Sequence, residues 1–228
     1  MKFGVVTFPG SNCDDDMIYV LRDILKQEVV NLWHKETDLQ GAEFIVLPGG
    51  FSYGDYLRSG AIAKLSPIMN EVVRHANKGG YVLGICNGFQ ILSESGLLEG
   101  ALLHNNNQKF ICKNVFLKPA NASTIITKEL DMDKAYKVPI AHGEGRFFAP
   151  EDMRKSILDN DQVIFRYCSE EGQLGDDFNP NGSINNIAGI CNKGRNVFGM
   201  MPHPERAADP ALGNEDGRLI LESILKNI

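Results

Sequence analysis

The chain has 228 residues, a formal net charge of −6 and an isoelectric point near 5.4. Its hydrophobic fraction of 43% and charged fraction of 23% are those of an ordinary globular protein, which excludes the disordered and fibrous classes. An acidic chain without a cluster of Lys and Arg lacks the phosphate-binding surface that nucleic-acid binding needs. We therefore expect a soluble globular protein that binds no nucleic acid.

A length of 228 residues suits one α/β domain, and we expect a single domain over residues 1–228. The longest apolar runs, such as residues 81–85, are the length of a strand and far short of the roughly 20 residues that cross a bilayer. The first residues lead straight into a strand-like run and lack the pattern of a signal peptide. These features predict a cytoplasmic protein without a membrane partner.

The cysteines are odd in number and widely spaced, and no two form a C-x-x-C pair. This spacing predicts neither a disulfide framework nor a metal site. In a reducing compartment most of them are expected to be small buried hydrophobic residues, so only their context can select a reactive one. The five are Cys13, Cys86, Cys112, Cys168 and Cys191.

The N-terminal half predicts alternating strands and helices. Residues 2–8 form a strand-like run, and a turn and a helix with apolar residues at helical spacing over 17–25 follow it. Residues 29–33 and 44–47 are nearly continuous apolar runs, which are typical of parallel strands covered on both faces. Ser66 and Pro67 mark the start of a helix that ends near residues 77–80. We expect a parallel sheet here.

Residues 81–85 predict the next strand, which runs directly into Cys86 and then into a short helix that stops at Gly96. From residue 109 onward the pattern changes to short strand-like pieces. These pieces cover residues 110–117, 137–141, 163–168, 186–191 and 196–201. A final helix with one apolar face is predicted over residues 216–227.

Cys86 lies at a predicted junction between a strand and a helix. The helix dipole and the first N–H groups of a helix favour a thiolate at such a position. Gly84 and Gly88 flank it and permit a strained turn, and the N–H of Asn87 lies where the elbow of a hydrolase binds an oxyanion. The alternative interpretation is a buried structural cysteine at a tight turn.

A base for this thiol is predicted in the segment 202–205. Pro202 and Pro204 are expected to exclude helix and to keep their neighbours extended, so that His203 and Glu205 project to the same side. A glutamate beside a histidine can fix its tautomer and stabilise the imidazolium. In isolation the pair is more typical of a solvated loop with a histidine beside an acid, and only its combination with Cys86 favours catalysis.

Gly49 and Gly50 follow the buried strand at 44–47, where their backbone N–H groups could approach a ligand closely. A turn of this kind is weak evidence for a binding site when it stands alone. Together with the N–H of Asn87 it would supply two donors for an oxyanion.

The segments 84–90, 48–50 and 202–205 together resemble the class I (triad) glutamine amidotransferases. Three more segments, at 10–14, 51–58 and 141–147, are similar to the branch of that family that serves phosphoribosylformylglycinamidine synthase, although Ser59 stands where the branch usually has proline. The resemblance spans residues 10–205. It implies an α/β fold, a flavodoxin-like three-layer sandwich with a mostly parallel central sheet and a small additional antiparallel part.

The resemblance also implies roles for individual residues. It makes Cys86 the nucleophile, His203 the base and Glu205 the residue that orients it. The implied oxyanion donors are Gly49, Gly50 and Asn87, and the implied glutamine-binding residues are Gln90, His142, Gly143 and Gly145. For Gly143 and Gly145 a simple glycine-rich turn remains open, and no metal ligand is implied.

The implied reaction is hydrolysis of glutamine to glutamate and ammonia, with the ammonia used by a large ATP-dependent synthetase subunit in purine biosynthesis and a small third subunit completing the complex. The chain has no P-loop pattern, so no cofactor is expected on it, and ATP and magnesium are expected on the synthetase. The alternatives are a glutaminase that serves a different synthetase and a DJ-1/PfpI-like cysteine hydrolase. A non-catalytic subunit would have lost a member of the triad.

Overall fold

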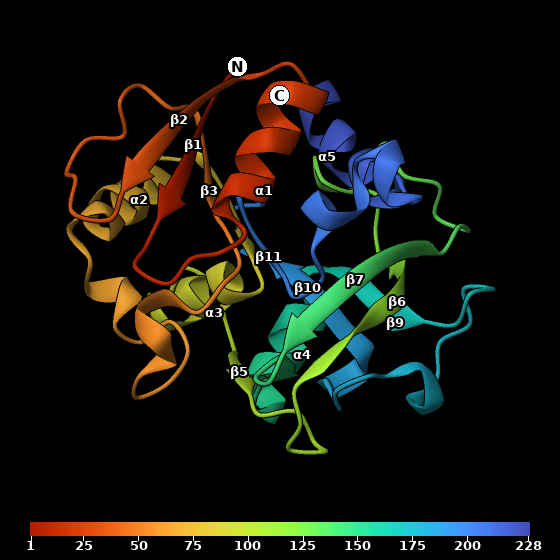
Figure 1. Cartoon of the computed structure of the whole chain (residues 1–228). Coiled ribbons are helices and arrows are strands. Elements are labelled where there is room, and N and C mark those ends of the chain that lie inside the picture. The colour runs from red at the N-terminus through yellow and green to blue at the C-terminus, as the bar shows by residue number, and fades with distance from the viewer. The chain divides into compact units, whose positions relative to one another are not determined.

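The computed structural model describes all of residues 1–228 (Figure 1). The chain divides into two compact units, the first made of residues 1–98 and 194–199 and the second of residues 99–193 and 200–228. No helix in either unit combines the length and the apolar character needed to cross a bilayer.

The first unit is built on a parallel sheet. Strand β1 pairs in parallel with β2 and β3, and β3 pairs in parallel with β4, which gives the order β2-β1-β3-β4 with β11 beside β4. This is the order of flavodoxin-like sheets. The predicted parallel sheet is confirmed. The bounds are β1 Lys2–Thr7, β2 Glu28–Trp33, β3 Phe44–Leu47, β4 Tyr81–Ile85 and β11 Val197–Met200.

Helices cover both faces of this sheet. Helix α1 (Asp14–Tyr19) packs on β1 and continues as a π-helical turn over Val20–Ile24, whereas α2 (Pro67–Asn77) and α3 (Asn87–Glu94) pack on β4. Figure 1 shows α1 in front of the strands and α2 behind them, which makes three layers. The predicted helices are confirmed, and the one predicted over 17–25 is wound more loosely in its second half.

Two glycines let α3 lie directly on the sheet. A Cβ on Gly88 would lie 1.9 Å from the carbonyl oxygen of Leu47 in β3, and a Cβ on Gly84 would lie 2.6 Å from the backbone of Gly88. No other side chain fits at either position. The packing of α3 on β3 therefore depends on residues that the sequence places two before and two after Cys86.

The second unit contains an antiparallel sheet in the order β10-β9-β6-β7. Its strands are β6 Ile111–Pro119, β7 Tyr136–His142, β9 Val163–Cys168 and β10 Ile187–Cys191. The strands β5 (Ala101–Leu103) and β8 (Arg146–Phe148) form a separate antiparallel pair that the sequence did not predict, because three residues are too few for a recognisable alternation. The α/β class with an added antiparallel part is confirmed.

Two helices complete the second unit. Helix α5 (Asp216–Lys226) is confirmed and packs on β7 and on the 3-10 turn Pro204–Ala207. Helix α4 (Glu151–Asp159) was missed, because only Ile157 of its nine residues is buried and its apolar stripe is too narrow to read. Further 3-10 turns lie at Asp176–Phe178, Ile184–Asn186 and Pro210–Leu212, and in the first unit at Ser52–Asp55 and Ala63–Leu65.

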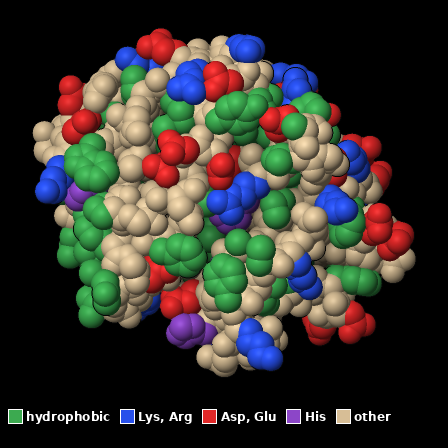
Figure 2. All heavy atoms as spheres, in the orientation of Figure 1, with side chains coloured by type: hydrophobic (Ala, Val, Ile, Leu, Met, Phe, Trp, Pro, Cys, Tyr) green, Lys and Arg blue, Asp and Glu red, His purple; other side chains and the backbone are tan.

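Charged side chains are mixed on the surface. On the face drawn in Figure 2, Lys and Arg stand among Asp and Glu instead of gathering into a basic field. Electrostatic attraction to a nucleic-acid backbone needs such a field. This surface agrees with the net charge of −6.

The close contact of α3 with β3 generates a prediction for Gly88→Ala. The added carbon would overlap the backbone of Leu47, which cannot rotate away as a side chain can. We expect the free energy of unfolding in urea to fall by about 3 kcal/mol or more, as for severe overpacking. The control is Gly175→Ala, whose added carbon meets nothing closer than 3.4 Å. Equal, small losses in the two variants would contradict this packing.

Candidate active site

Cys86 lies in the turn between β4 and α3, as predicted. Its backbone has φ 50° and ψ −105°, a combination that costs energy for any residue with a side chain. The thiol is buried, with 4% of the residue exposed, and the N–H groups of the first turn of α3 have no acceptor within the helix. Strain of this kind at the end of a strand is the geometry of a nucleophile elbow.

The other cysteines lack this geometry. Cys13 precedes the short helix α1 with an unstrained φ of −113°, and its thiol donates to Oδ1 of Asn12 at 3.2 Å. Burial raises the pKa of Cys168 to about 11, which disfavours its thiolate. Cys112 is exposed on β6. None of the cysteines forms a disulfide, and the backbone singles out Cys86.

The turn at Gly49 and Gly50 lies at the same edge of the sheet as Cys86. Leu47 is aligned with Gly84 in the parallel pair β3–β4, so residues two further along each strand leave the sheet side by side. Gly50 has φ +139°, and a Cβ there would lie 2.7 Å from the backbone nitrogen of Asn12. Only glycine fits this turn. The predicted oxyanion donors are therefore placed together within the first unit.

Asn87 and Gln90 are linked on α3. Nδ2 of Asn87 donates to Oε1 of Gln90 at 2.9 Å, and both residues are buried. This hydrogen bond occupies one of the two lone pairs of the Gln90 amide oxygen, so it is compatible with the predicted role of this side chain in binding glutamine.

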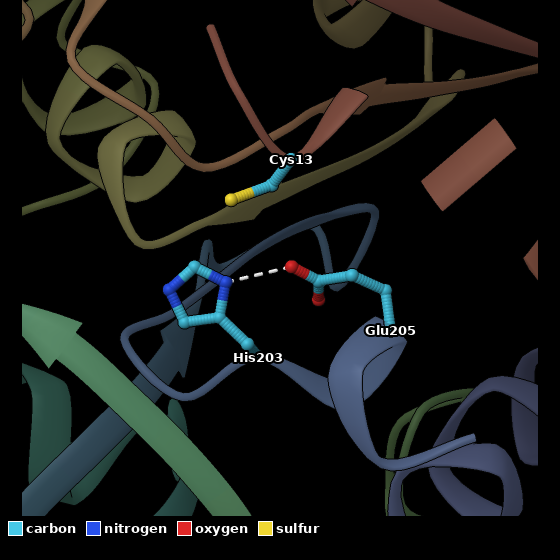
Figure 3. Close-up of side chains that lie close together, drawn as sticks. All are labelled: Cys13, His203 and Glu205. Atoms are coloured by element: carbon cyan, nitrogen blue, oxygen red, sulfur yellow. Dashed lines mark hydrogen bonds and ion pairs between the residues drawn. The ribbon is translucent and has the colours of Figure 1, made fainter. Parts of the chain in front are cut away.

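His203 and Glu205 form a buried pair in the second unit (Figure 3). Nδ1 of His203 lies 2.6 Å from Oε1 of Glu205, and the side chains are 2% and 1% exposed. A carboxylate can only accept here, so it fixes the tautomer in which Nδ1 carries the hydrogen and Nε2 carries the lone pair that the predicted base would use. The backbone N–H of His203 donates to Pro139 in β7 at 2.8 Å, which anchors the histidine to the sheet.

The predicted local conformation of this pair was wrong at Pro204. Pro204 begins a 3-10 turn instead of an extended segment. A proline at the first position of a helix loses only an N–H that would have no partner there, so it starts helices as readily as it prevents them further in. The turn is pressed against α5, because a Cβ on Gly217 would lie 2.2 Å from the carbonyl oxygen of Pro204. His203 and Glu205 still form the predicted pair, although the backbone at Pro204 differs from the predicted extended conformation.

His142 ends β7 and is buried, with 3% of the residue exposed. Burial, with a smaller contribution from the charge of His203, lowers its pKa to about 4, so its imidazole is neutral near neutral pH. Asn105 donates from Nδ2 to the carbonyl oxygen of His142 at 2.9 Å, and its Oδ1 accepts the N–H of Gly145 at 3.1 Å. This fixes Oδ1 as the acceptor that faces Nδ1 of His142, also at 3.1 Å.

The tautomer of His142 follows from these contacts. Nδ1 must donate to Asn105, which leaves Nε2 as a lone-pair acceptor, buried and without a hydrogen-bond partner. Gly145 makes room for the ring, because a Cβ there would lie 2.2 Å from Cε1 of His142. Gly143 lies between them, and its carbonyl oxygen accepts the N–H of Asn105 at 2.9 Å.

Several polar residues that support these groups were not predicted. Ser52 contacts Asn87, Asn181 donates to the carbonyl oxygen of Gly145 at 2.8 Å, and Ser183 accepts the N–H of Phe147 at 3.0 Å. Asparagine and serine in loops usually cap turns, so no pattern in the sequence indicates that Asn105 and these residues are buried and shape a site.

The predicted site residues thus fall into two groups. The first unit holds the nucleophile, the oxyanion donors and one glutamine-binding residue, namely Cys86, Gly49, Gly50, Asn87 and Gln90. The second unit holds the histidine–glutamate pair and the remaining glutamine-binding residues, namely His203, Glu205, His142, Gly143 and Gly145. Their catalytic roles remain predictions.

A strained cysteine between a parallel strand and a helix, with a histidine–glutamate pair on the same chain, suits a cysteine-dependent amidohydrolase. Residues 1–216 match the model of the CobB/CobQ-like glutamine amidotransferase domain. The chain therefore belongs to this family of glutamine amidotransferases.

The chain is also similar to individual named proteins of this family. The chain is 55% identical, over 225 residues, to phosphoribosylformylglycinamidine synthase subunit PurQ of Chlorobium chlorochromatii, with 99% of this chain and 96% of the relative covered. It is 54% identical to the subunit of the same name from Trichormus variabilis, with 100% and 98% covered. A chain in the solved structure of PurLQS from Thermotoga maritima is 43% identical and superposes with a TM-score of 0.86, covering 99% of this chain and 97% of that one.

The buried neutral His142 predicts a pH dependence of stability. Its pKa in the folded protein, about 4, lies below the ordinary value of 6.5, so the unfolded chain binds a proton first as the pH falls. The free energy of unfolding should therefore fall between pH 6.5 and pH 4, by up to roughly 3 kcal/mol from this residue, and stay unaffected by it above pH 6.5. Urea unfolding of the chain and of His142→Asn across this range checks it. Parallel pH profiles would contradict the assignment.

Proposed function

We propose that the chain is the glutaminase subunit of phosphoribosylformylglycinamidine synthase, of the PurQ type. It hydrolyses glutamine to glutamate and ammonia and passes the ammonia to a synthetase subunit in purine biosynthesis. Family membership and the similarity to PurQ subunits over nearly the whole chain support this. The structural observation that carries the hydrolytic part is the strained Cys86 at the start of α3.

In the first half of the proposed reaction, His203 takes the proton of the Cys86 thiol, and the resulting thiolate attacks the side-chain carboxamide carbon of glutamine. The new C–S bond turns the carbonyl oxygen into an oxyanion, which accepts hydrogen bonds from the turn at Gly49–Gly50 and from the backbone N–H of Asn87. His203 gives a proton to the nitrogen, the C–N bond breaks, and ammonia leaves a γ-glutamyl thioester on the sulfur.

In the second half, His203 accepts a proton from water as the water attacks the thioester. The C–S bond breaks, the thiolate is restored and glutamate leaves. Glu205 stabilises the imidazolium that exists in both halves, because its carboxylate lies 2.6 Å from Nδ1. Gln90, His142, Gly143 and Gly145 are proposed to bind the rest of the glutamine molecule.

The use of ammonia is proposed to occur on other chains. A large PurL-type subunit would hold ATP and magnesium, and a small PurS-type subunit would complete the complex, as the solved structure of PurLQS from Thermotoga maritima suggests. We propose no cofactor and no metal for this chain, since the reaction above needs only its own side chains. We also propose that residues 1–228 act as one amidotransferase domain and that the protein is cytoplasmic, where cysteines persist without forming disulfides.

Glu205→Gln should keep the fold and lower glutaminase turnover. The amide retains the shape of the side chain but removes the negative charge that stabilises the imidazolium, and we expect kcat to fall by about 10² to 10⁴. Glutaminase assays of the reconstituted complex, with circular dichroism as the folding control, provide the measurement. Turnover within about twofold of the original would show that Glu205 has no part in the reaction.

Cys86→Ala tests the proposed function as a whole. In a complex with PurL-type and PurS-type subunits, it should abolish glutamine-dependent synthesis while synthesis from added ammonium salt continues, because the synthetase site is on another chain. The measurement is the rate of formylglycinamidine ribonucleotide formation with each nitrogen source. If both rates collapsed in a complex that still assembles, Cys86 would act through structure and the proposal would fail.

A further inference from the structure

Both polar atoms of the Asn87 side chain are hydrogen-bonded to neighbouring residues. Its Oδ1 accepts the backbone N–H of Ser52 at 3.1 Å and also the hydroxyl of Ser52. Its Nδ2 donates to Oε1 of Gln90 at 2.9 Å and to Oδ1 of Asp55 at 3.3 Å. With 1% of the residue exposed, no polar atom of this amide remains to bind a substrate.

The partner of Asn87 is an unusual turn. Ser52–Asp55 is a 3-10 turn in which Tyr53, Gly54 and Asp55 all have positive φ, at 56°, 69° and 54°. Such a conformation persists only where contacts hold it. On its other side the turn is anchored by the hydroxyl of Tyr53, which lies 2.6 Å from Nδ1 of His34 and 2.9 Å from Oγ of Ser66.

Asn87 thereby connects two parts of the first unit that meet at the carboxyl edge of the sheet. It is the first residue of α3, directly after Cys86, and Ser52 stands two residues after Gly50. The segments that carry both proposed oxyanion donors are therefore joined through one side chain.

We propose that the side chain of Asn87 is a positioning residue, which fixes the direction of its own backbone N–H toward the oxyanion by tying the start of α3 to the Ser52–Asp55 turn. This inference rests on the proposed glutaminase function and assigns the amide a role other than substrate binding. Without the tie, the first turn of α3 can shift while Cys86 remains in place.

The kinetic signature of this role is specific. The oxyanion forms only after the thiolate attacks, so a displaced donor weakens binding of the transition state and leaves ground-state binding of glutamine nearly unchanged. Complete loss of one oxyanion donor lowers kcat by about 10² to 10³, so a displaced donor should cost about 10-fold to 100-fold. Alkylation of Cys86 by iodoacetamide forms no oxyanion, so its rate should be the same whether or not the donor is displaced.

The experiment compares Asn87→Ala and Ser52→Ala with the unmodified chain in the reconstituted complex. For Asn87→Ala we expect kcat for glutamine hydrolysis to fall about 10-fold to 100-fold, with KM within about threefold and the iodoacetamide rate within about twofold. Ser52→Ala removes one hydroxyl and keeps the backbone, so it should show the same pattern at about 3-fold to 10-fold, and it keeps the test valid if Asn87→Ala does not fold.

The matched control is Asn196→Ala. Asn196 is another buried asparagine of the first unit, and its Nδ2 ties the carbonyl oxygens of Ala76 and Gly80 together at 2.8 Å each. Its loss should lower the melting temperature and leave kcat unchanged. In the double variant Ser52→Ala/Asn87→Ala, the loss in kcat should equal that of Asn87→Ala alone, because both act through one contact.

Three results would overturn the inference. A rise in KM that accounts for the lost activity would make Asn87 a substrate ligand, an equal loss in the iodoacetamide rate would place its effect on the thiol, and additive losses in the double variant would separate it from Ser52. Failure of the proposed function looks different, because the unmodified chain would then hydrolyse no glutamine in the complex.

Discussion

The backbone of Cys86 has a positive φ between a buried strand and a helix. The packing of the first unit around this residue holds it in that conformation. A strained residue of this kind costs about 1 to 3 kcal/mol and persists only where its surroundings over-determine it. Gly88 lets α3 press on the backbone of Leu47, Gly84 makes room for that helix, and the parallel register of β3 and β4 brings Gly49 to the same edge. A side chain on Gly84 or Gly88 would move the helix that follows Cys86, the proposed nucleophile.

The second unit buries two histidines, His203 and His142, and holds the imidazole of each in one tautomer. Glu205 does this for His203 with a buried carboxylate, whereas Asn105 does it for His142 with a neutral amide. The charged partner suits the role proposed for His203, in which the imidazole would become a cation during the reaction. The neutral partner suits one that stays neutral, and burial with a pKa of about 4 keeps His142 in that form. The chemistry of each histidine is therefore set by its partner.

The sequence predicted the parallel part of the fold well, because fully buried strands such as 44–47 and 81–85 are short apolar runs with clear turns on both sides. It predicted Cys86 at a strand–helix junction for the same reason. It missed α4 and the pair β5–β8, which bury too little to leave a periodic pattern. It also misjudged Pro204, since a proline that ends one helix can begin another.

Polar networks were the least predictable part. Asn105, Ser52 and Asn181 are ordinary loop residues in the sequence, and their importance comes from partners 37, 35 and 36 positions away. Periodicity reports burial of apolar side chains and carries no information about which distant carbonyl an amide will meet. For the same reason the sequence identified the groups proposed to react and did not identify those that hold them in place.

If Cys86 is the nucleophile, an electrophilic analogue of glutamine should capture it covalently. A diazo-ketone analogue of glutamine should modify one cysteine of the chain in the assembled complex, and peptide mapping by mass spectrometry should place the added mass on Cys86, with glutamine protecting it. Modification of Cys13, the other cysteine beside the Gly49–Gly50 turn, with Cys86 unmodified would contradict the account.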